Sequence, residues 1–261
     1  MRFIIDLMPL PIGILFLVGF VFTLFKISHS NTMLEKQRVG LKYLIYLLYF
    51  IVIQFIISPL LNPNKYISMA FLSVLLLLSA FEIYRIKSNL KAKNLLLFVL
   101  IMLGTALLFR FRQGMLELYI FYCVFIFDGM SQIGGQVFGK HKLSPKISPN
   151  KTWEGFFTGL IFSVVSMLIL DNVNDYFFIK SQYFKPIFYS MICSLALIGD
   201  LFFSKLKRLS NIKDFGNYIP GHGGLLDRID SLIFTYVIVF YIYFIIFIVL
   251  LCKSDGLLKI Y

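Results

Sequence analysis

Long apolar stretches separated by short polar segments make up most of this chain of 261 residues. Each stretch approaches the roughly 20 residues with which an α-helix crosses about 30 Å of hydrocarbon. The pattern therefore predicts an all-α, polytopic integral membrane protein with about eight transmembrane helices. The predicted spans are 7–25, 43–61, 66–84, 94–109, 116–135, 155–170, 186–204 and 231–251.

Composition narrows the class of protein further. Hydrophobic residues make up 59% of the chain and charged residues 15%, against about 45–50% and about 25% in soluble domains. This balance excludes a soluble globular protein and a disordered one. We therefore expect one integrated membrane domain, in which residues 1–110 form N-terminal transmembrane helices. Residues 111–261 form a C-terminal candidate catalytic region with polar loops at 136–155 and 205–230.

The formal net charge of +12 bears on topology and partners. In a membrane protein this charge indicates cytoplasmic loops, anionic lipid head groups or a phosphorylated substrate rather than nucleic acid. Of the 25 lysines and arginines, 17 fall in loops on one side of the predicted membrane and 8 on the other. The first side is predicted to be cytoplasmic, which places both polar loops there and both termini outside.

One carboxylate lies inside an apolar stretch. Asp128 follows Phe125-Ile126-Phe127, and a carboxylate in the bilayer costs several kcal/mol unless it is paired or lines a wet cavity. At helical spacing Asp128, Ser131, Gln132 and Gly135 share one face that runs toward the cytoplasmic end. This stripe indicates either a buried structural cluster or a ligand or metal site at the membrane boundary.

The loop at 136–155 is basic. Its four lysines could neutralise phosphate groups, although basic residues in a cytoplasmic loop are also an ordinary topology signal. Trp153 stands where an aromatic membrane-interface anchor belongs. Glu154 opens the next helix, where an acid suits the helix dipole.

The second polar segment, 199–230, concentrates acids, bases and glycines. Asp200 and Ser204 share a helix face, as do Asp227 and Asp230 if the last helix begins there. Mg²⁺ takes carboxylate oxygens together with waters and substrate phosphates, so Asp200 and Asp227 from two helices form a candidate metal site. The glycines around His222 allow backbone N–H groups to approach phosphate oxygens.

The order of residues in this segment resembles the signature of the phosphatidate cytidylyltransferases, also called CDP-diacylglycerol synthases. The matching elements are Ser204, Lys207-Arg208, Lys213-Asp214, Pro220-Gly221-His222-Gly223-Gly224, Asp227-Arg228 and Asp230. A second element of the family is similar to Phe138-Gly139-Lys140 and Ser148-Pro149-Asn150-Lys151-Thr152-Trp153-Glu154-Gly155. The resemblance covers roughly the C-terminal half, while the N-terminal spans match only as hydrophobic helices.

The resemblance implies a reaction and its partners. CTP and phosphatidic acid, or a related lipid phosphate, would give CDP-diacylglycerol and pyrophosphate in the presence of Mg²⁺. The metal-binding acids of the family fall on Asp200 and Asp227. A second, monovalent cation and a homodimer are compatible with the resemblance. We expect the protein in the cell (plasma or inner) membrane, with the lipid bilayer as a partner and without nucleic acid.

These arguments define three sets of candidate residues. The candidate catalytic residues are Asp128, Lys151, Ser204, Lys207, Arg208, Asp214 and Asp230. The candidate substrate-binding residues are Lys140, Asn150, Glu154, Lys205, Lys213, His222, Gly223, Gly224 and Arg228. The candidate metal ligands are Asp200 and Asp227.

One departure and two rival functions stay open. Gln136 stands where the family often has arginine, and the loss of a cation there could alter the choice of lipid. A CTP-dependent polyprenol kinase would also be polytopic, but would transfer the γ-phosphoryl group and release CDP. A transporter could carry an intramembrane acid, but the chain has no visible internal repeat and its polar groups gather near one membrane face.

Overall fold

The computed structural model describes most of the chain from residue 114 onward and isolated parts of the region before it. The described residues are 74, 77–84, 94, 96–98, 100, 101, 104, 114–174, 183–216, 224 and 226–258. The predicted spans 7–25 and 43–61 lie outside these residues, and the spans 66–84 and 94–109 lie partly outside them.

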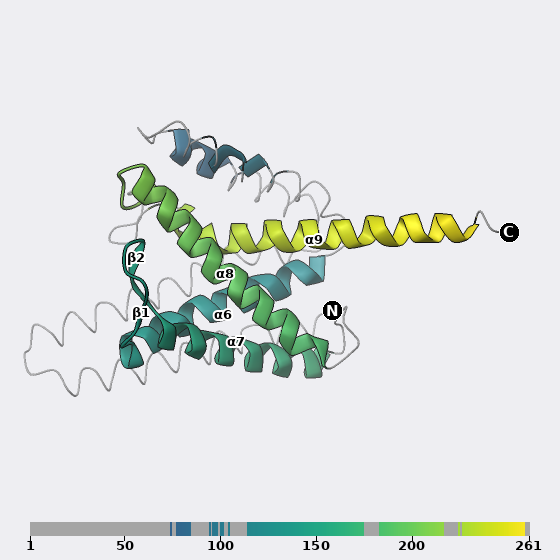
Figure 1. Cartoon of the computed structure of the whole chain (residues 1–261), viewed down its shortest axis with the longest axis horizontal. Coiled ribbons are helices and arrows are strands. Elements are labelled where there is room, and N and C mark those ends of the chain that lie inside the picture. The colour runs from purple at the N-terminus through teal and green to yellow at the C-terminus, as the bar shows by residue number, and fades with distance from the viewer. Residues whose placement is uncertain are drawn as a thin grey trace, which may run out of the picture.

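Four long helices form the described C-terminal region (Figure 1). They are α6 (Gly114–Phe138), α7 (Trp153–Asn174), α8 (Phe184–Leu209) and α9 (Leu226–Leu258). Within the described residues, Trp153–Asn172, Phe184–Leu209 and Leu226–Ile246 are long and apolar enough to cross a membrane. The prediction of a helical membrane protein is thereby confirmed, whereas the count of eight spans stays a prediction.

Each helix contains one predicted span and extends beyond it. The largest extension at a start is in α9, which begins at Leu226 rather than at residue 231. Asp227 therefore lies in its first turn, where a negative charge interacts favourably with the helix dipole. Asp230 follows three residues later in the same helix, so Asp227 and Asp230 share one face of α9.

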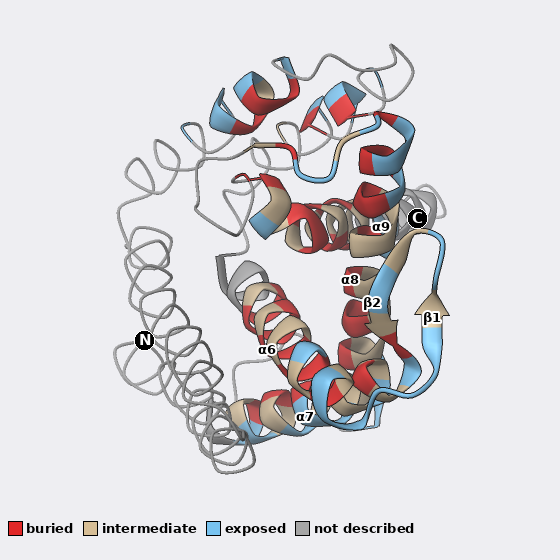
Figure 2. Cartoon of the chain, turned by 90° about the vertical axis from the view of Figure 1, so that its left-hand side faces the viewer, coloured by how far each residue is buried: buried red, intermediate tan, exposed pale blue. Residues whose placement is uncertain are grey.

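A small β-hairpin, which the sequence analysis did not anticipate, fills most of the loop at 136–155. Strand β1 (Lys142–Ser144) pairs antiparallel with β2 (Ser148–Thr152). Glu154 binds the chain where it enters β1, because its carboxylate accepts the backbone N–H groups of Lys140 and His141 at 3.1 Å. Figure 2 shows the hairpin beside the helices, with exposed and half-buried residues along both strands. The all-α prediction thus holds for the long elements and omits this hairpin.

Glycines bring α6 and α7 into close contact. A Cβ atom on Gly155 would lie 2.6 Å from the Ser131 carbonyl oxygen, and one on Gly159 would lie 2.8 Å from the Phe127 carbonyl oxygen. In the other direction, a Cβ atom on Gly134 would lie 2.5 Å from the side chain of Thr158. Small residues spaced by four allow helix backbones to approach in this way in membranes.

Two clusters of apolar side chains pack the described helices together. The first joins α6, α7, α8 and α9 through Cys123, Phe127, Met167, Ile192 and Val239, among others. The second joins the C-terminal end of α8 and the N-terminal part of α9 to residues before position 101. It contains Ile83, Leu96, Phe203, Phe215 and Leu226. Residues before position 101 therefore pack directly against the helices that carry the signature segment (Figure 1).

Candidate active site

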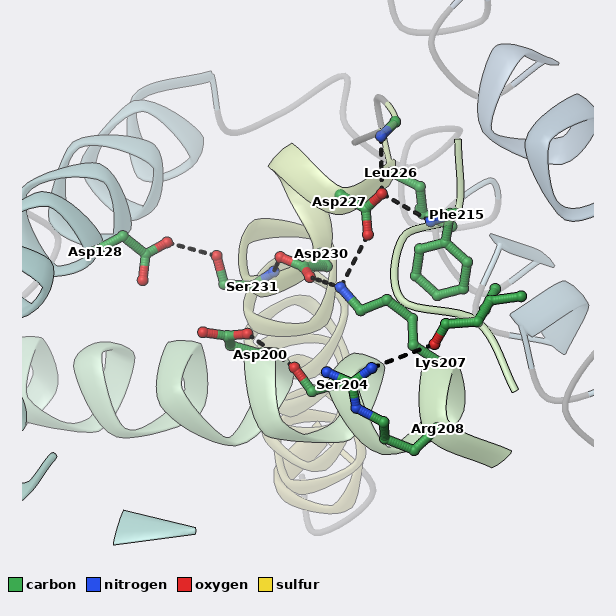
Figure 3. Close-up of polar contacts among 12 residues, drawn as sticks. Asp128, Asp200, Ser204, Lys207, Arg208, Phe215, Leu226, Asp227, Asp230 and Ser231 are labelled. Atoms are coloured by element: carbon green, nitrogen blue, oxygen red, sulfur yellow. Dashed lines mark hydrogen bonds and ion pairs between the residues drawn. The ribbon is translucent and has the colours of Figure 1, made fainter. Parts of the chain in front are cut away.

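Helix α8 presents its polar residues on successive turns near its C-terminal end. Asp200, Ser204 and Lys207 follow one another at intervals of four and three, so they lie along one face. The Ser204 hydroxyl donates a hydrogen bond to Asp200 Oδ1 at 3.4 Å. Figure 3 shows this face turned toward the start of α9. The helix periodicity alone therefore aligns three candidate residues of the signature.

Lys207 joins α8 to both acids at the start of α9. Its ammonium nitrogen lies 2.9 Å from Asp227 Oδ1 and 3.5 Å from Asp230 Oδ2. It also lies 5.2 Å from the centre of the Phe215 ring, within the range of a cation–π contact. Only 11% of the side chain is exposed. The lysine is thus fixed between two carboxylates and a ring rather than extended into solvent.

Asp227 binds the backbone as well as Lys207. Its second oxygen, Oδ2, accepts the N–H groups of Phe215 and Gly224, both at 2.8 Å. The carboxylate thereby ties Phe215, in the segment after α8, and Gly224, just before α9, to the first turn of α9 (Figure 3). Three donors on one buried carboxylate give Asp227 a structural role in addition to its negative charge.

Asp128 reaches the same region from α6. Its Oδ2 accepts a hydrogen bond of 2.6 Å from the Ser231 hydroxyl of α9. Its Oδ1 is buried and accepts no hydrogen bond from any residue that the structure describes. Asp230 lies beside it, with Oδ1 accepting the Ser231 N–H at 2.8 Å. The intramembrane acid Asp128 is therefore part of a polar cluster between helices, and its Oδ1 atom has no hydrogen-bond donor among the described residues.

The hairpin contributes Lys151 to this cluster. Lys151, near the end of β2, forms an ion pair with Asp200 of α8. Burial alone would lower the pKa of the Lys151 ammonium group, but the negative charges of Asp200 and Asp128 more than offset it, and the pKa lies above its ordinary value. The Lys151 side chain is therefore a permanent cation at neutral pH.

Together these contacts define an acid–lysine cluster, made of Asp128, Asp200, Asp227, Asp230, Lys151 and Lys207. Its members come from α6, β2, α8 and α9, and their charges act on one another. Four carboxylates against two ammonium groups leave a formal excess of two negative charges. A divalent cation would balance that excess, and the free Oδ1 atom of Asp128 is a suitable hard oxygen ligand.

The fit to Mg²⁺ depends on how many ligands the protein must supply. Among the residues that the structure describes, no three histidine, cysteine or acidic side chains form a group that would hold a metal ion. Mg²⁺, however, is commonly bound by one or two carboxylates, with waters and substrate phosphates completing its shell. The donor set therefore fits an ion that binds together with a phosphorylated substrate.

The remaining candidate residues surround the cluster or lie apart from it. Arg208 is exposed, and its guanidinium group donates to the Ile212 carbonyl oxygen at 3.4 Å. The Glu154 carboxylate accepts hydrogen bonds from the backbone at the start of the hairpin. Gly224 is buried, and its N–H donates to the Asp227 carboxylate. The exposed candidates are Lys140, Asn150, Lys205, Lys213, Asp214 and Arg228. His222 and Gly223 lie outside the described residues.

Sequence reasoning missed two residues that contact this region. Ser231 binds Asp128, and Glu82 accepts the Leu226 N–H at 2.8 Å from 144 positions away in the sequence. Glu82 could have been singled out as Asp128 was, because it is an acid near the end of an apolar stretch. Ser231 carries no comparable signal, since serine is common near the start of helices.

These features define a helical membrane protein whose acidic and basic side chains meet between helices near the start of α9. A sequence profile described as the cytidylyltransferase family matches residues 3–247. The chain belongs to the cytidylyltransferase family, and the match includes the N-terminal region as well as the cluster.

Curated relatives carry a more specific name. The chain is 45% identical over 129 residues to the phosphatidate cytidylyltransferase of Rickettsia bellii, covering 47% of this chain and 55% of the relative. It is 39% identical over 135 residues to the enzyme of that name from Haemophilus influenzae, covering 51% of this chain and 46% of the relative. The aligned part thus spans about half the length of the curated relatives that it matches.

Proposed function

We propose that this protein transfers the cytidylyl group of CTP to phosphatidic acid or a related lipid phosphate, giving CDP-diacylglycerol and pyrophosphate. The observation that carries the proposal is the acid–lysine cluster, in which α6, β2, α8 and α9 each contribute charged side chains. Membership of the cytidylyltransferase family and the names of the relatives support the choice of nucleotide and lipid.

The chemistry asks the protein mainly for positioning and charge stabilisation. An ionised oxygen of the lipid phosphate attacks the α-phosphorus of CTP, and the bond to the pyrophosphate leaving group breaks. No strong general base is needed, because the attacking phosphate is already ionised. Catalysis of phosphoryl-type transfer rests largely on orientation and electrostatics, which fixed cations supply.

Two lysines are suited to that electrostatic role. Lys151 is paired with Asp200, and Lys207 with Asp227 and Asp230; the Lys151 side chain is 27% exposed and the Lys207 side chain 11%. Substrate phosphates that compete for these ammonium groups would find them already oriented. The exposed Arg208 lies at the end of the same face of α8 as Ser204 and extends the positive charge beyond the cluster.

Mg²⁺ is part of the proposal as the counter-charge of the cluster. Asp200 remains the predicted ligand on α8 and Asp227 the predicted ligand on α9, and Asp128 offers its unpaired Oδ1. Bound there, the ion would neutralise charge on the transferring phosphate and the leaving pyrophosphate. Because Asp227 already accepts three hydrogen bonds, Asp128 and Asp200 are the more available carboxylates.

Product analysis tests the proposed reaction. The purified protein is incubated with Mg²⁺, CTP labelled in the α-phosphate and a panel of lipid phosphates that includes phosphatidic acid and a polyprenol phosphate acceptor. We expect label in the lipid fraction and release of pyrophosphate. The panel also shows whether Gln136, an exposed residue near the end of α6, accompanies a changed lipid preference.

Other outcomes would contradict the proposal. Release of labelled CDP without labelled lipid would indicate γ-phosphoryl transfer, as in a CTP-dependent lipid kinase. Absence of any CTP-dependent product, with substrate movement across vesicles, would favour a transporter. Asp200→Asn is the matched negative control for true turnover, because it keeps the side-chain volume and removes one charge of the cluster.

We also propose how the protein is oriented in the membrane. CTP is a cytoplasmic metabolite, so the cluster, the hairpin and the start of α9 should face the cytoplasm. The excess of lysine and arginine on that side supports this orientation in the cell membrane.

A further inference from the structure

Glu82 is a buried acid outside the acid–lysine cluster. It belongs to the helical residues 77–84 and is 2% exposed. A buried carboxylate is costly unless hydrogen bonds or charges compensate it. Its Oε2 accepts the backbone N–H of Leu226 at 2.8 Å. A residue of the N-terminal region therefore binds the first residue of α9.

The position of this bond in α9 is informative. The first N–H groups of a helix have no partner within the helix and must be satisfied from outside. Glu82 satisfies the N–H of Leu226, and the Asp227 carboxylate satisfies the N–H of Gly224. Two carboxylates from distant parts of the chain thus bind the backbone N–H groups of Gly224 and Leu226, and one of them belongs to the cluster.

The backbone at Gly224 is also confined sterically. A Cβ atom on Gly224 would lie 2.6 Å from Glu82 Oε1 and 2.8 Å from the Gly216 nitrogen. The space that a side chain at this position would need is therefore filled by the Glu82 carboxylate and by the backbone after α8. Without a side chain at position 224 the carboxylate can approach this closely.

Glu82 is held on a rigid base. The next residue, Ile83, is 1% exposed and packs in the apolar cluster with Phe203, Phe215 and Leu226. A displacement of Glu82 would therefore require repacking of the cluster that joins α8 to α9. The packing of Ile83 therefore holds Glu82 in place beside Gly224 and Leu226.

We infer that Glu82 is a positioning residue, which fixes the backbone at Gly224 and Leu226 and thereby orients Asp227 for the phosphates of the nucleotide. The inference rests on the proposed function for the identity of the substrate. Glu82 acts through the backbone of these two residues, so its removal changes substrate binding without removing a group that contacts the reacting atoms.

Three variants separate positioning from general stability. Glu82→Ala removes the acceptor, and Glu82→Gln keeps an oxygen that can accept the Leu226 N–H. Ser79→Ala is the matched control, since Ser79 is a polar residue of the same helical segment and is 1% exposed. Each variant is purified at full length in detergent, and its thermal unfolding is recorded.

The first measurement is the steady-state kinetics of cytidylyl transfer. We expect Glu82→Ala to raise the KM for CTP by about 10- to 100-fold, the range seen when groups that orient a ligand are removed. Glu82→Gln should restore the KM to within about threefold of the unchanged protein, since it retains the accepting oxygen. Ser79→Ala should leave the KM unchanged. Equal KM values for CTP in Glu82→Ala and Ser79→Ala would overturn the inference.

The second measurement does not depend on activity. Hydrogen–deuterium exchange is followed in peptides that cover residues 213–230, in the absence of nucleotide. We expect faster exchange there in Glu82→Ala and ordinary exchange in Glu82→Gln and Ser79→Ala. If the unchanged protein fails to transfer cytidylyl groups, the proposed function fails, while the exchange data still decide whether Glu82 fixes the backbone at Gly224 and Leu226. Unaltered exchange in Glu82→Ala would refute its positioning role.

Discussion

At the scale of single residues, the four acids of the cluster have unequal surroundings. Asp227 accepts hydrogen bonds from Lys207, Phe215 and Gly224, whereas Asp200 accepts one long bond from Ser204 and pairs with Lys151. Acids that look equivalent in a motif therefore differ in how much of the fold depends on them. This difference leads to the first prediction.

The first prediction compares Asp200→Asn with Asp227→Asn. Both should reduce turnover by orders of magnitude, because each removes a negative charge from the proposed metal site. Only Asp227→Asn should also destabilise the protein, by about 1–3 kcal/mol, since an amide group cannot accept all three buried donors.

Thermal unfolding in detergent, alongside cytidylyl transfer across a Mg²⁺ titration, checks this prediction. Equal stability of the two variants would show that the hydrogen bonds to Asp227 contribute little. Turnover like that of the unchanged protein in both would place the metal elsewhere.

The second prediction concerns Lys151. Lys151→Met should lower turnover by about 100-fold, because it removes a preoriented cation from the site. Lys146→Met is the matched control, since Lys146 is an exposed lysine between the strands of the same hairpin. Activity of the two variants measured side by side is the test, and similar losses would mean that hairpin charge, rather than the position of Lys151, matters.

The pH dependence of this ion pair follows from the raised pKa of Lys151. A lysine whose folded pKa exceeds its ordinary value of about 10.4 stabilises the fold fully below that value. Its contribution is lost only as the pH rises through the folded pKa. The stability difference between the unchanged protein and Lys151→Met should therefore stay constant from neutral pH to about pH 9.

At the scale of elements, the contact between α6 and α7 determines where Asp128 and Lys151 lie. Asp128 is on α6, and Lys151 lies in β2, two residues before the start of α7 at Trp153. The two helices approach through glycines, so their separation depends on the absence of side chains at these positions. The hairpin itself is fixed to the start of α7 by Glu154.

The third prediction tests this close packing. Gly155→Ala places a Cβ atom 2.6 Å from the Ser131 carbonyl oxygen, so the helices must move apart. We expect a loss of about 1–3 kcal/mol of stability, as in other overpacked interfaces, together with reduced turnover. Gly104→Ala is the control, because a Cβ atom there meets no atom of the described residues within 4 Å. Thermal unfolding of the two variants should differ clearly, and indistinguishable curves would contradict the packing argument.

At the scale of the whole molecule, the charged cluster lies near the end of α8 and the start of α9, together with the hairpin (Figure 1). The N-terminal region reaches this end as well, through Glu82 and Ile83. The proposed reaction joins a nucleotide to a lipid phosphate, so it requires the cluster to lie at the membrane surface on the side where CTP is present.

The fourth prediction tests this orientation. Single cysteines at Ser144, in the hairpin, and at Asn217, in the signature segment, are introduced into a cysteine-free background. In intact cells neither should react with an impermeant thiol reagent applied from outside, and both should react after the membrane is opened. Labelling of either cysteine in intact cells would reverse the proposed topology.

Much of the site was predictable because helical spacing constrains it. The spacing of Asp200 with Ser204, and of Asp227 with Asp230, placed each pair on one face, and the helices are observed there. Asp128 was recognised because an acid is costly in an apolar stretch. The hairpin was not predicted, since its strands are only three and five residues long and carry no strong alternation.

The sequence by itself determined that the chain is a helical membrane protein and which polar segments carry its chemistry. Both follow from local pattern, because span length, apolar composition and residue order are properties of contiguous chain. Only the tertiary structure decided that Lys151 pairs with Asp200, that Ser231 binds Asp128 and that Glu82 reaches Leu226. These contacts join residues up to 144 positions apart, and no local periodicity specifies which helix faces meet when the helices pack.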